Sequence, residues 1–407
     1  MDSRITLNAK NIGDCTFQSE EIDNYHELDD AGKRKWLHDS LLFHMSLGSK
    51  ELFHSNTWAW LIERDETFAR LFFPDIPVGV PIRVTREERN RDLTIWINKG
   101  TPNEIAYVIE NKFKSIPRLG QLLQYERETG AAFQGGVVTG IERPLWMQRA
   151  SRWTFLPYAE ISRRIKLALK GSSHIGELYK KVLIDYCRMI DNMCSVLENF
   201  LGRYQGLLLR TEECMELSDV RLEDLVNKLS AERFANWLTS QSEIIRLKQR
   251  VEERGLRFFI LTDYLKKHAI VDVRIVSDVR TDDEIIKDHG GTSPWLMGVQ
   301  IENDGYGRCF QVGDQIRTNG GRPWGHGEIF SRFNGLGWLP RKTDLPNSTV
   351  RRVDYGHYEV RGKYSFVYQP ERLRDLSYGA LRDKLLLDMS AACDFVERND
   401  IQRILCG

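Results

Sequence analysis

The sequence predicts an α/β chain: a mixed sheet flanked by helices, then a helical region, then an α+β C-terminal domain. Three observations lead to this expectation. In the first half, short apolar β-branched runs alternate with stretches of helical spacing, the order typical of α/β layers. From Ile175 to about Arg254 only helical spacing recurs. From Leu256 onward, strand-like runs are separated by loops rich in Gly, Asn and Pro. The expected divisions are 1–35, 36–172, 173–255 and 256–407.

Residues 1–35 are polar and lack a clear pattern, so they are expected to form a lead-in. Helical spacing then runs from Trp36 to Gly48. Ser49 is a suitable N-cap for a second helix, KELFHSNTWAWLIER, with Glu51 in its first turn.

Five strands and two further helices are expected after these first helices. The third strand-like run is almost wholly apolar, as in a strand covered on both faces. Pro117 opens a helix at a permitted position, and that helix supplies a crossover between parallel strands. The strands are expected at Val80–Val84, Leu93–Ile97, Ile105–Ile109, Gly135–Thr139 and Trp153–Leu156, and the last helix runs through Ile161, Ile165 and Leu169.

The second half is expected to begin with helices and to end in strands and one closing helical stretch. The segment 241–254 is polar and charged, which leaves an extended helix or a connector open. The strand-like runs are Phe258–Leu265, Val271–Val276, Trp295–Ile301 and Tyr358–Tyr368, and the closing helical stretch is Leu373–Leu405.

Composition places this chain among ordinary globular proteins. Lys plus Arg and Asp plus Glu both total 58, so a polyanionic partner needs a local basic surface. The seven cysteines form no CxxC pair, and the N-terminus has no secretory apolar region. No apolar run approaches the roughly 20 residues of a membrane span. These features indicate a reduced, cytoplasmic protein without a membrane partner.

Charged side chains stand at the ends of two neighbouring predicted strands. Asp92 precedes the second strand, and Glu110 and Lys112 end the third. Adjacent strands lie about 4.8 Å apart, so the two carboxylates can share one cation. Mg²⁺ takes oxygen ligands, typically one or two carboxylates with water and phosphate. The backbone carbonyl of Asn111 is a natural further ligand, and Lys112 can polarise water or neutralise charge on phosphate.

Simpler readings of the same residues remain open. Asp92 can cap the turn before its strand, and Glu110 with Lys112 can form a same-face ion pair on an edge strand. Gln121 and Tyr125 can be exposed helix residues. His54 is more often a structural hydrogen-bonding group than a metal ligand or base in such a position, and the pair Trp58 and Trp60 is expected in the core.

The motif Arg91-Asp92 … Glu110-Asn111-Lys112 resembles that of the PD-(D/E)XK nuclease superfamily of restriction-endonuclease-like proteins. The stretch KELFHSNTWAWLIE resembles the first helix of one branch with a long C-terminal extension. QLLQY resembles the helix after the ExK strand, and WTFLPYAEI resembles the last core strand and its helix. Together these cover roughly residues 36–169. Arg91 replaces the usual proline.

The resemblance implies a restriction-endonuclease-like core at 36–172 and Mg²⁺- or Mn²⁺-dependent cleavage of phosphodiesters. It assigns Asp92 and Glu110 as metal ligands, Lys112 as catalytic, and Glu51 and Gln121 as accessory residues. Glu63 is the alternative helix acid; Glu51 is favoured because it precedes His-Ser-Asn. The family also implies nucleic acid as the partner, DNA before RNA, a setting in prokaryotic restriction or antiviral defence, and a homodimer as one arrangement.

Two basic stretches are candidate nucleic-acid contacts. Residues 143–170 hold Arg143, Arg149 and Arg152, and residues 305–353 mix basic with aromatic side chains, among them Arg322 and Trp324. Basic residues interleaved with aromatics can follow a phosphate backbone and stack on bases. The simpler reading is a solvated loop region whose aromatic rings form a small core.

Two other functions fit the sequence. One is a catalytically inactive nuclease fold that acts as a nucleic-acid-binding module. The other is a regulatory protein that senses a ligand or another protein through residues 256–407.

Overall fold

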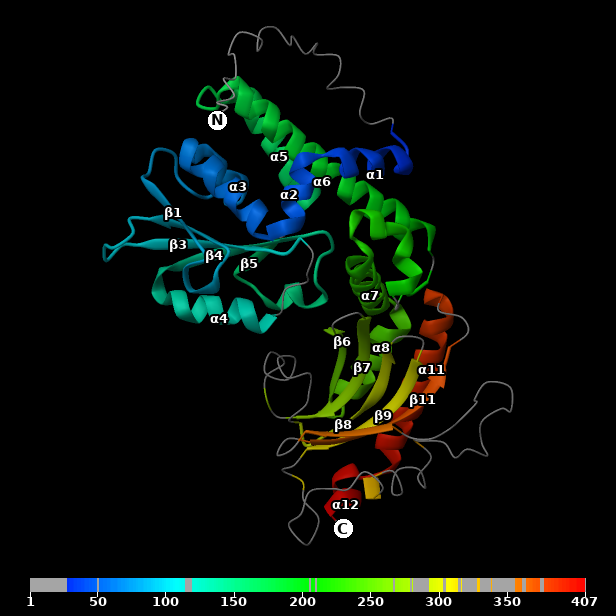
Figure 1. The fold of residues 1–407 in the computed structure, drawn as a ribbon. Coiled ribbons are helices and arrows are strands. Elements are labelled where there is room, and N and C mark those ends of the chain that lie inside the picture. Colours follow the sequence, from blue (N-terminus) through cyan, green and yellow to red (C-terminus); the bar gives the residue numbers. More distant parts are fainter. Residues whose placement is uncertain are drawn as a thin grey trace, which may run out of the picture.

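The computed structural model describes residues 28–49, 51–113, 119–204, 206–208, 211–265, 268–278, 280, 293–302, 305–313, 316, 328–329, 338, 356–360, 364–373 and 377–406. The described chain contains two sheets, each accompanied by helices (Figure 1). This confirms the expected α/β class. None of the described helices is both long and apolar enough to cross a membrane.

The first sheet is mixed and has five strands in the spatial order of the sequence. Its first three strands pair antiparallel, and the third, fourth and fifth pair parallel. The parallel step from the third strand to the fourth is made by helix α4 (Leu119–Thr129), as a crossover requires. The strands are β1 (Ile82–Arg86), β2 (Leu93–Ile97), β3 (Ile105–Asn111), β4 (Phe133–Gly140) and β5 (Trp153–Pro157).

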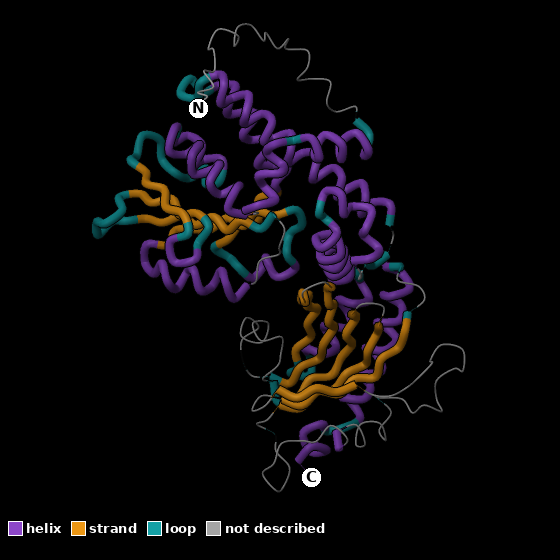
Figure 2. The backbone as a smooth tube through the Cα atoms, viewed as in Figure 1, coloured by secondary structure: helices purple, strands orange, loops and turns teal. Residues whose placement is uncertain are grey.

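Helices cover both faces of this sheet (Figures 1 and 2). On one side, α3 (Glu51–Arg64) and α5 (Tyr158–Gly171) share a core with Ile109 of β3. On the other side, α4 shares a core with Val108. Successive strand residues alternate between faces, so Glu110 and Lys112 belong to the α4 side.

The middle of the chain is helical, as expected, and 241–254 is mostly a helix. Short 3₁₀ segments join several elements. The remaining helices before the second sheet are α1 (Asp30–Asp39), α2 (Leu41–Ser49), α6 (Glu177–Arg203), α7 (Glu223–Thr239) and α8 (Ser242–Glu252), and the 3₁₀ segments are η4 (Glu66–Leu71), η5 (Glu88–Asn90), η6 (Gly130–Ala132), η7 (Leu145–Arg149) and η8 (Thr211–Val220). Helix α1 therefore begins inside the segment 1–35.

The second sheet has six strands, and every neighbouring pair is antiparallel. Residues of α7, α8 and the long helix α11 share a core with one face of this sheet (Figure 1). In spatial order the strands are β10 (Gly356–Val360), β11 (Tyr364–Arg372), β9 (Gly305–Gly313), β8 (Trp295–Glu302), β7 (His268–Ser277) and β6 (Arg257–Leu265), and the closing helices are α11 (Tyr378–Arg398) and α12 (Ile401–Cys406).

Two strand expectations were wrong in the second half. The run Tyr358–Tyr368 was taken as one strand, but it belongs to two strands, β10 and β11. Strand β9 was not expected, because GYGRCFQVG is rich in glycine and carries polar residues. Glycine weakens a strand by itself. Here β8 and β11 pair with β9 from both sides, so tertiary pairing outweighs local preference.

Candidate metal-dependent active site

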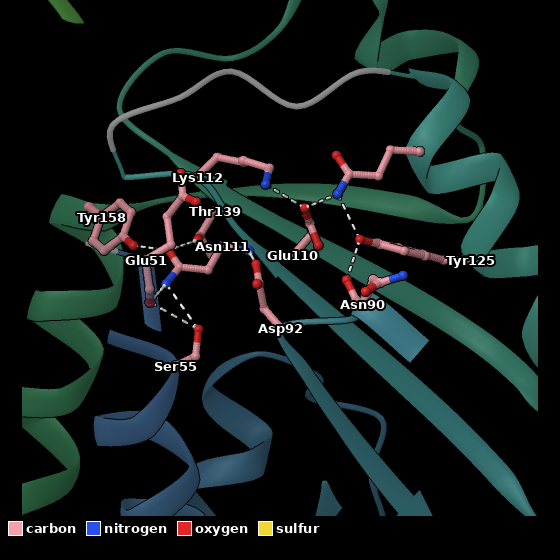
Figure 3. Close-up of polar contacts among 11 residues, drawn as sticks. Glu51, Ser55, Asn90, Asp92, Glu110, Asn111, Lys112, Tyr125, Thr139 and Tyr158 are labelled. Atoms are coloured by element: carbon pink, nitrogen blue, oxygen red, sulfur yellow. Dashed lines mark hydrogen bonds and ion pairs between the residues drawn. The ribbon is translucent and has the colours of Figure 1, made fainter. Parts of the chain in front are cut away.

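Asp92 and Glu110 face each other across two antiparallel strands. In the β2–β3 ladder Leu93 pairs with Ile109, so the next position along places Asp92 opposite Glu110. The backbone N–H of Asn111 donates to Asp92 Oδ2 at 2.7 Å. Antiparallel pairing brings the start of one strand beside the end of the next, and this brings the two predicted metal ligands together (Figure 3).

Glu110 is fully buried. A single carboxyl oxygen of Glu110, Oε1, contacts both Lys112 and Gln121. Lys112 Nζ lies 2.7 Å from Glu110 Oε1, and Gln121 Nε2 donates to the same oxygen at 2.7 Å. Glu110 Oε2 is buried and has no hydrogen-bond partner among the described residues. The same-face ion pair is therefore present, but β3 is a central strand of the sheet and not an edge strand.

Helix α4 holds the site through a stripe of three residues spaced four apart. Gln121 contacts Glu110, and its amide also donates to the hydroxyl of Tyr125 at 2.6 Å. The Tyr125 hydroxyl donates to the carbonyl of Asn90 at 2.6 Å. One turn further, Thr129 Oγ1 accepts a bond from the guanidinium of Arg91. Gln121 and Tyr125 are thus not surface residues of an independent helix.

Glu51 opens helix α3 beside these groups, whereas Glu63 lies at the other end of α3 and is exposed. A helix rises about 1.5 Å per residue, so roughly 18 Å of helix axis separates these two acids. The side chain of Asn111 bonds to the backbone carbonyl of Glu51 (Figure 3). The choice of Glu51 over Glu63 as the acid near the site agrees with this arrangement.

Burial and crowding of negative charge change the protonation of the two carboxyls. Burial raises the pKa of Glu110 to about 8; Lys112 opposes this rise, and Asp92 and Glu51 add to it. Burial also raises the pKa of Asp92. Without a cation, burial therefore favours the protonated form of both carboxyls.

Lys112 keeps its charged form, in contrast to the two carboxyls. Its burial disfavours the charged ammonium, but Glu110, Glu51 and Asp92 outweigh burial and raise the pKa of Lys112. The ammonium is therefore retained at neutral pH. When all four groups are ionised, three carboxylates and one ammonium leave a net charge of −2, which one divalent cation would balance.

The donors present fit a small oxygen-seeking cation. Such a cation needs carboxylate oxygens that lack other partners, and Glu110 Oε2 beside Asp92 meets this need. In the described part of the chain, no three or more His, Cys, Asp or Glu residues converge as a metal-ligand group. The predicted ligand set therefore remains two carboxylates and the carbonyl of Asn111, with water and substrate as the other ligands.

His54 and Trp58 take structural roles in the described structure. Both are fully buried on α3, and His54 Nδ1 shares a hydrogen bond with the hydroxyl of Tyr186 at 2.9 Å. The His54 ring also lies 4.4 Å from the Phe113 ring and 5.1 Å from the Tyr158 ring, centroid to centroid. The reading of His54 as a structural hydrogen-bonding residue is confirmed, as is the core position of Trp58. Trp60 is half-buried and packs against the same core.

The predicted nucleic-acid contacts are described only in part. Arg143 and Arg152 are exposed, and Arg152 lies 4.5 Å above the ring of Phe133 and bonds to its carbonyl. The side chain of Arg149 lies outside the described residues, as do Arg322 and Trp324. Of the aromatic rings in the second basic stretch, Tyr306, Phe310 and Trp338 are buried in the C-terminal core, where they cannot stack on bases.

Sequence reasoning did not identify the polar residues that support this site. Asn90, Thr129, Thr139 and Tyr158 bond to site residues, yet each looks ordinary in the sequence. Tyr158 lies within the quoted stretch WTFLPYAEI, and that position is the only signal which the sequence offered. No family model, curated protein or solved structure matches the chain.

Proposed function

We propose that this chain is a Mg²⁺-dependent nuclease that hydrolyses phosphodiester bonds in DNA. The proposal rests chiefly on Glu110, a fully buried carboxylate with one oxygen left without a partner beside a second carboxylate. The charged form of such an acid is costly unless a cation offsets it, and Lys112 contacts only its other oxygen. The sequence resemblance to restriction-endonuclease-like proteins is the second support, and it also suggests a role in prokaryotic restriction or antiviral defence.

When bound, Mg²⁺ would lower the pKa of a water molecule and hold the scissile phosphate. Asp92 and Glu110 would bind the cation, with Asp92 oriented by the N–H of Asn111 and Glu110 by the amide of Gln121. Lys112 retains its proton, so it acts as a positive charge beside the phosphate and not as a general base.

The proposed reaction forms a bond from a water oxygen to phosphorus and breaks the bond from phosphorus to the 3′ oxygen. The products are a 5′-phosphate and a 3′-hydroxyl. The water loses its proton to solvent, and the leaving oxygen gains one. Lys112 neutralises part of the negative charge that grows on the phosphate oxygens.

Substitution of the site residues tests the function directly. We expect purified protein to nick or linearise plasmid DNA in the presence of Mg²⁺ and to be inactive in EDTA. Asp92→Asn and Lys112→Met should each lower the cleavage rate by about 100-fold or more, since each removes an electrostatic contribution to the transition state.

Controls come from an exposed ion pair on helix α8. Lys248 Nζ lies 3.6 Å from Glu252 Oε1 there, and α8 shares a core with the second sheet. Lys248→Met and Glu252→Gln should cleave at the wild-type rate. If wild type, Asp92→Asn and Lys112→Met are equally inert but bind DNA, the chain is instead a binding module on this fold.

A further inference from the structure

The side chain of Asn111 is the centre of a buried polar network on the opposite face of β3 from Glu110. Its Nδ2 donates to the backbone carbonyl of Glu51 and to Ser55 Oγ, the latter at 3.1 Å. Its Oδ1 accepts from the hydroxyl of Tyr158 and from Thr139 Oγ1, the latter at 3.3 Å. Figure 3 shows these bonds meeting at Asn111.

These four bonds use every donor and lone pair that a carboxamide offers. They join β3 to the first turn of α3, to β4 and to the start of α5. Asn111 itself is fully buried. A buried polar network in which every member is paired is rigid, because any rearrangement leaves a group without a partner.

The network fixes the turn of α3 from which the Glu51 side chain leaves. The Glu51 carboxylate adds negative charge to the site: it contributes to the raised pKa values of Asp92, Glu110 and Lys112. The strength of such an interaction falls with distance. A small shift of the first turn of α3 therefore changes how strongly Glu51 favours a cation between the other two acids.

We infer that Asn111 is a positioning residue: its amide holds the first turn of α3 so that Glu51 contributes to cation affinity at the Asp92–Glu110 pair. This inference rests on the proposed metal site. It gives the middle residue of Glu110-Asn111-Lys112 a role for its side chain, separate from the role of its backbone carbonyl.

Tyr158→Phe tests the inference, because it removes one bond to Asn111 and leaves the ring in place. We expect Mn²⁺ affinity, measured by isothermal calorimetry, to fall about threefold to tenfold, the range that loss of one hydrogen bond allows. Tyr186→Phe is the matched control. Tyr186 is also a buried tyrosine that bonds to His54, but none of its described bonds joins it to Asn111. This control should keep wild-type affinity.

A double-mutant cycle with Glu51→Gln separates positioning from general loosening of the fold. If Asn111 acts through Glu51, Tyr158→Phe should have no further effect on Mn²⁺ affinity in the Glu51→Gln background. Equal losses in both backgrounds, or unchanged affinity in Tyr158→Phe alone, would overturn the inference. Ser55→Ala removes a bond on the other side of the amide and should repeat the result if Tyr158→Phe folds poorly.

Failure of this inference and failure of the proposed function give different results. If wild type binds Mn²⁺ through Asp92 and Glu110 but Tyr158→Phe binds it equally well, only the positioning role is wrong. If wild type takes up no Mn²⁺, the metal site and the positioning role are both wrong. Metal binding without DNA cleavage overturns the nuclease proposal. The double-mutant cycle with Glu51→Gln then still decides whether Asn111 is a positioning residue.

Discussion

The fold strongly shifts the protonation of Glu110. Burial and its acidic neighbours raise its pKa from 4.5 to about 8. Between these two pH values the folded protein binds a proton that the unfolded chain has lost. The free energy of unfolding therefore decreases as pH rises through this window, because the native state binds more protons than the unfolded state.

This pH dependence should be visible in thermal unfolding without metal. As pH rises from about 5 to about 8.5, the unfolding midpoint of wild type should fall relative to that of Glu110→Gln. One unit of pKa is worth about 1.4 kcal/mol, and about 1 kcal/mol moves the midpoint of a large domain by about 2–4 °C. A relative fall of about 5 °C or more is expected; parallel pH profiles for the two proteins would contradict the raised pKa.

Residue types and strand alternation were sufficient to predict the acidic pair and Lys112. Asp92, Glu110 and Lys112 lie where two apolar strands end, and charges in such positions are conspicuous in a sequence. Asn111 was noted only for its carbonyl. Its side chain faces α3 and α5, and the partners that use it, Ser55 and Tyr158, are far away in the chain. Such a network depends on tertiary structure and leaves no local pattern.

At the scale of elements, α4 holds the loop that carries Asp92. This loop contains three residues other than glycine, Glu87, Arg89 and Asn90, with positive φ. Such backbone conformations cost free energy, and they persist only where surrounding contacts hold them in place. The contacts come from α4: Tyr125 bonds to the Asn90 carbonyl, and Thr129 bonds to Arg91, which is 1% exposed.

Thr129→Val should destabilise the protein by about 1–3 kcal/mol, because it leaves the buried Arg91 guanidinium with one acceptor fewer. Thr57→Val is the matched control: each threonine hydroxyl donates to the carbonyl four residues earlier, but Thr57 is not bonded to an arginine. Urea unfolding midpoints measure the difference. Equal losses in the two variants would show that Arg91 does not depend on Thr129.

The elements themselves were predicted well where the pattern is strong and the pairing is local. Strand β2 lies at the predicted residues, and β3 extends two residues beyond its prediction. The missed strand β9 has weak strand propensity, and β11, one of its partners, lies more than 50 residues later in the sequence. Strand β9 forms because neighbouring strands pair with it, and the nine residues of β9 alone do not reveal those neighbours.

At the scale of the whole molecule, helix α7 joins the five-stranded sheet to the second sheet. Glu232 of α7 is fully buried; it accepts the N–H of Leu145 at 3.0 Å and the hydroxyl of Thr262 in β6. Arg233 pairs with Glu142 at 2.9 Å. Residues 142–145 follow β4, which pairs with β3 beside Glu110.

An apolar core also spans the two sheets. Leu122 of α4 and Val138 of β4 belong to one buried cluster with Phe259 of β6 and Leu296 of β8. The sequence predicted separate regions but gave no sign of this contact, because apolar residues on a strand look the same whichever partner covers them. The C-terminal sheet is therefore packed against the side of the five-stranded sheet on which Glu110 lies.

Glu232→Gln should weaken this junction. The carboxylate of Glu232 accepts charge-assisted bonds from the Leu145 N–H and the Thr262 hydroxyl. A carboxamide keeps these contacts only as weaker neutral bonds, with its N–H₂ donating to the Thr262 oxygen. The free energy of unfolding should fall by about 1–3 kcal/mol. Glu252→Gln, which alters an exposed pair with Lys248 on α8, is the control and should change it by less than about 0.5 kcal/mol.

Hydrogen exchange localises the effect of Glu232→Gln. Amides of residues 141–147 and of β6 should exchange faster together, while those of α11, which does not contact Glu232 through any described bond, should keep their wild-type rates. Faster exchange in only one of these two segments would mean that Glu232 supports that segment alone. Unchanged exchange on both sides, with stability equal to that of Glu252→Gln, would show that the apolar core by itself holds the two sheets together.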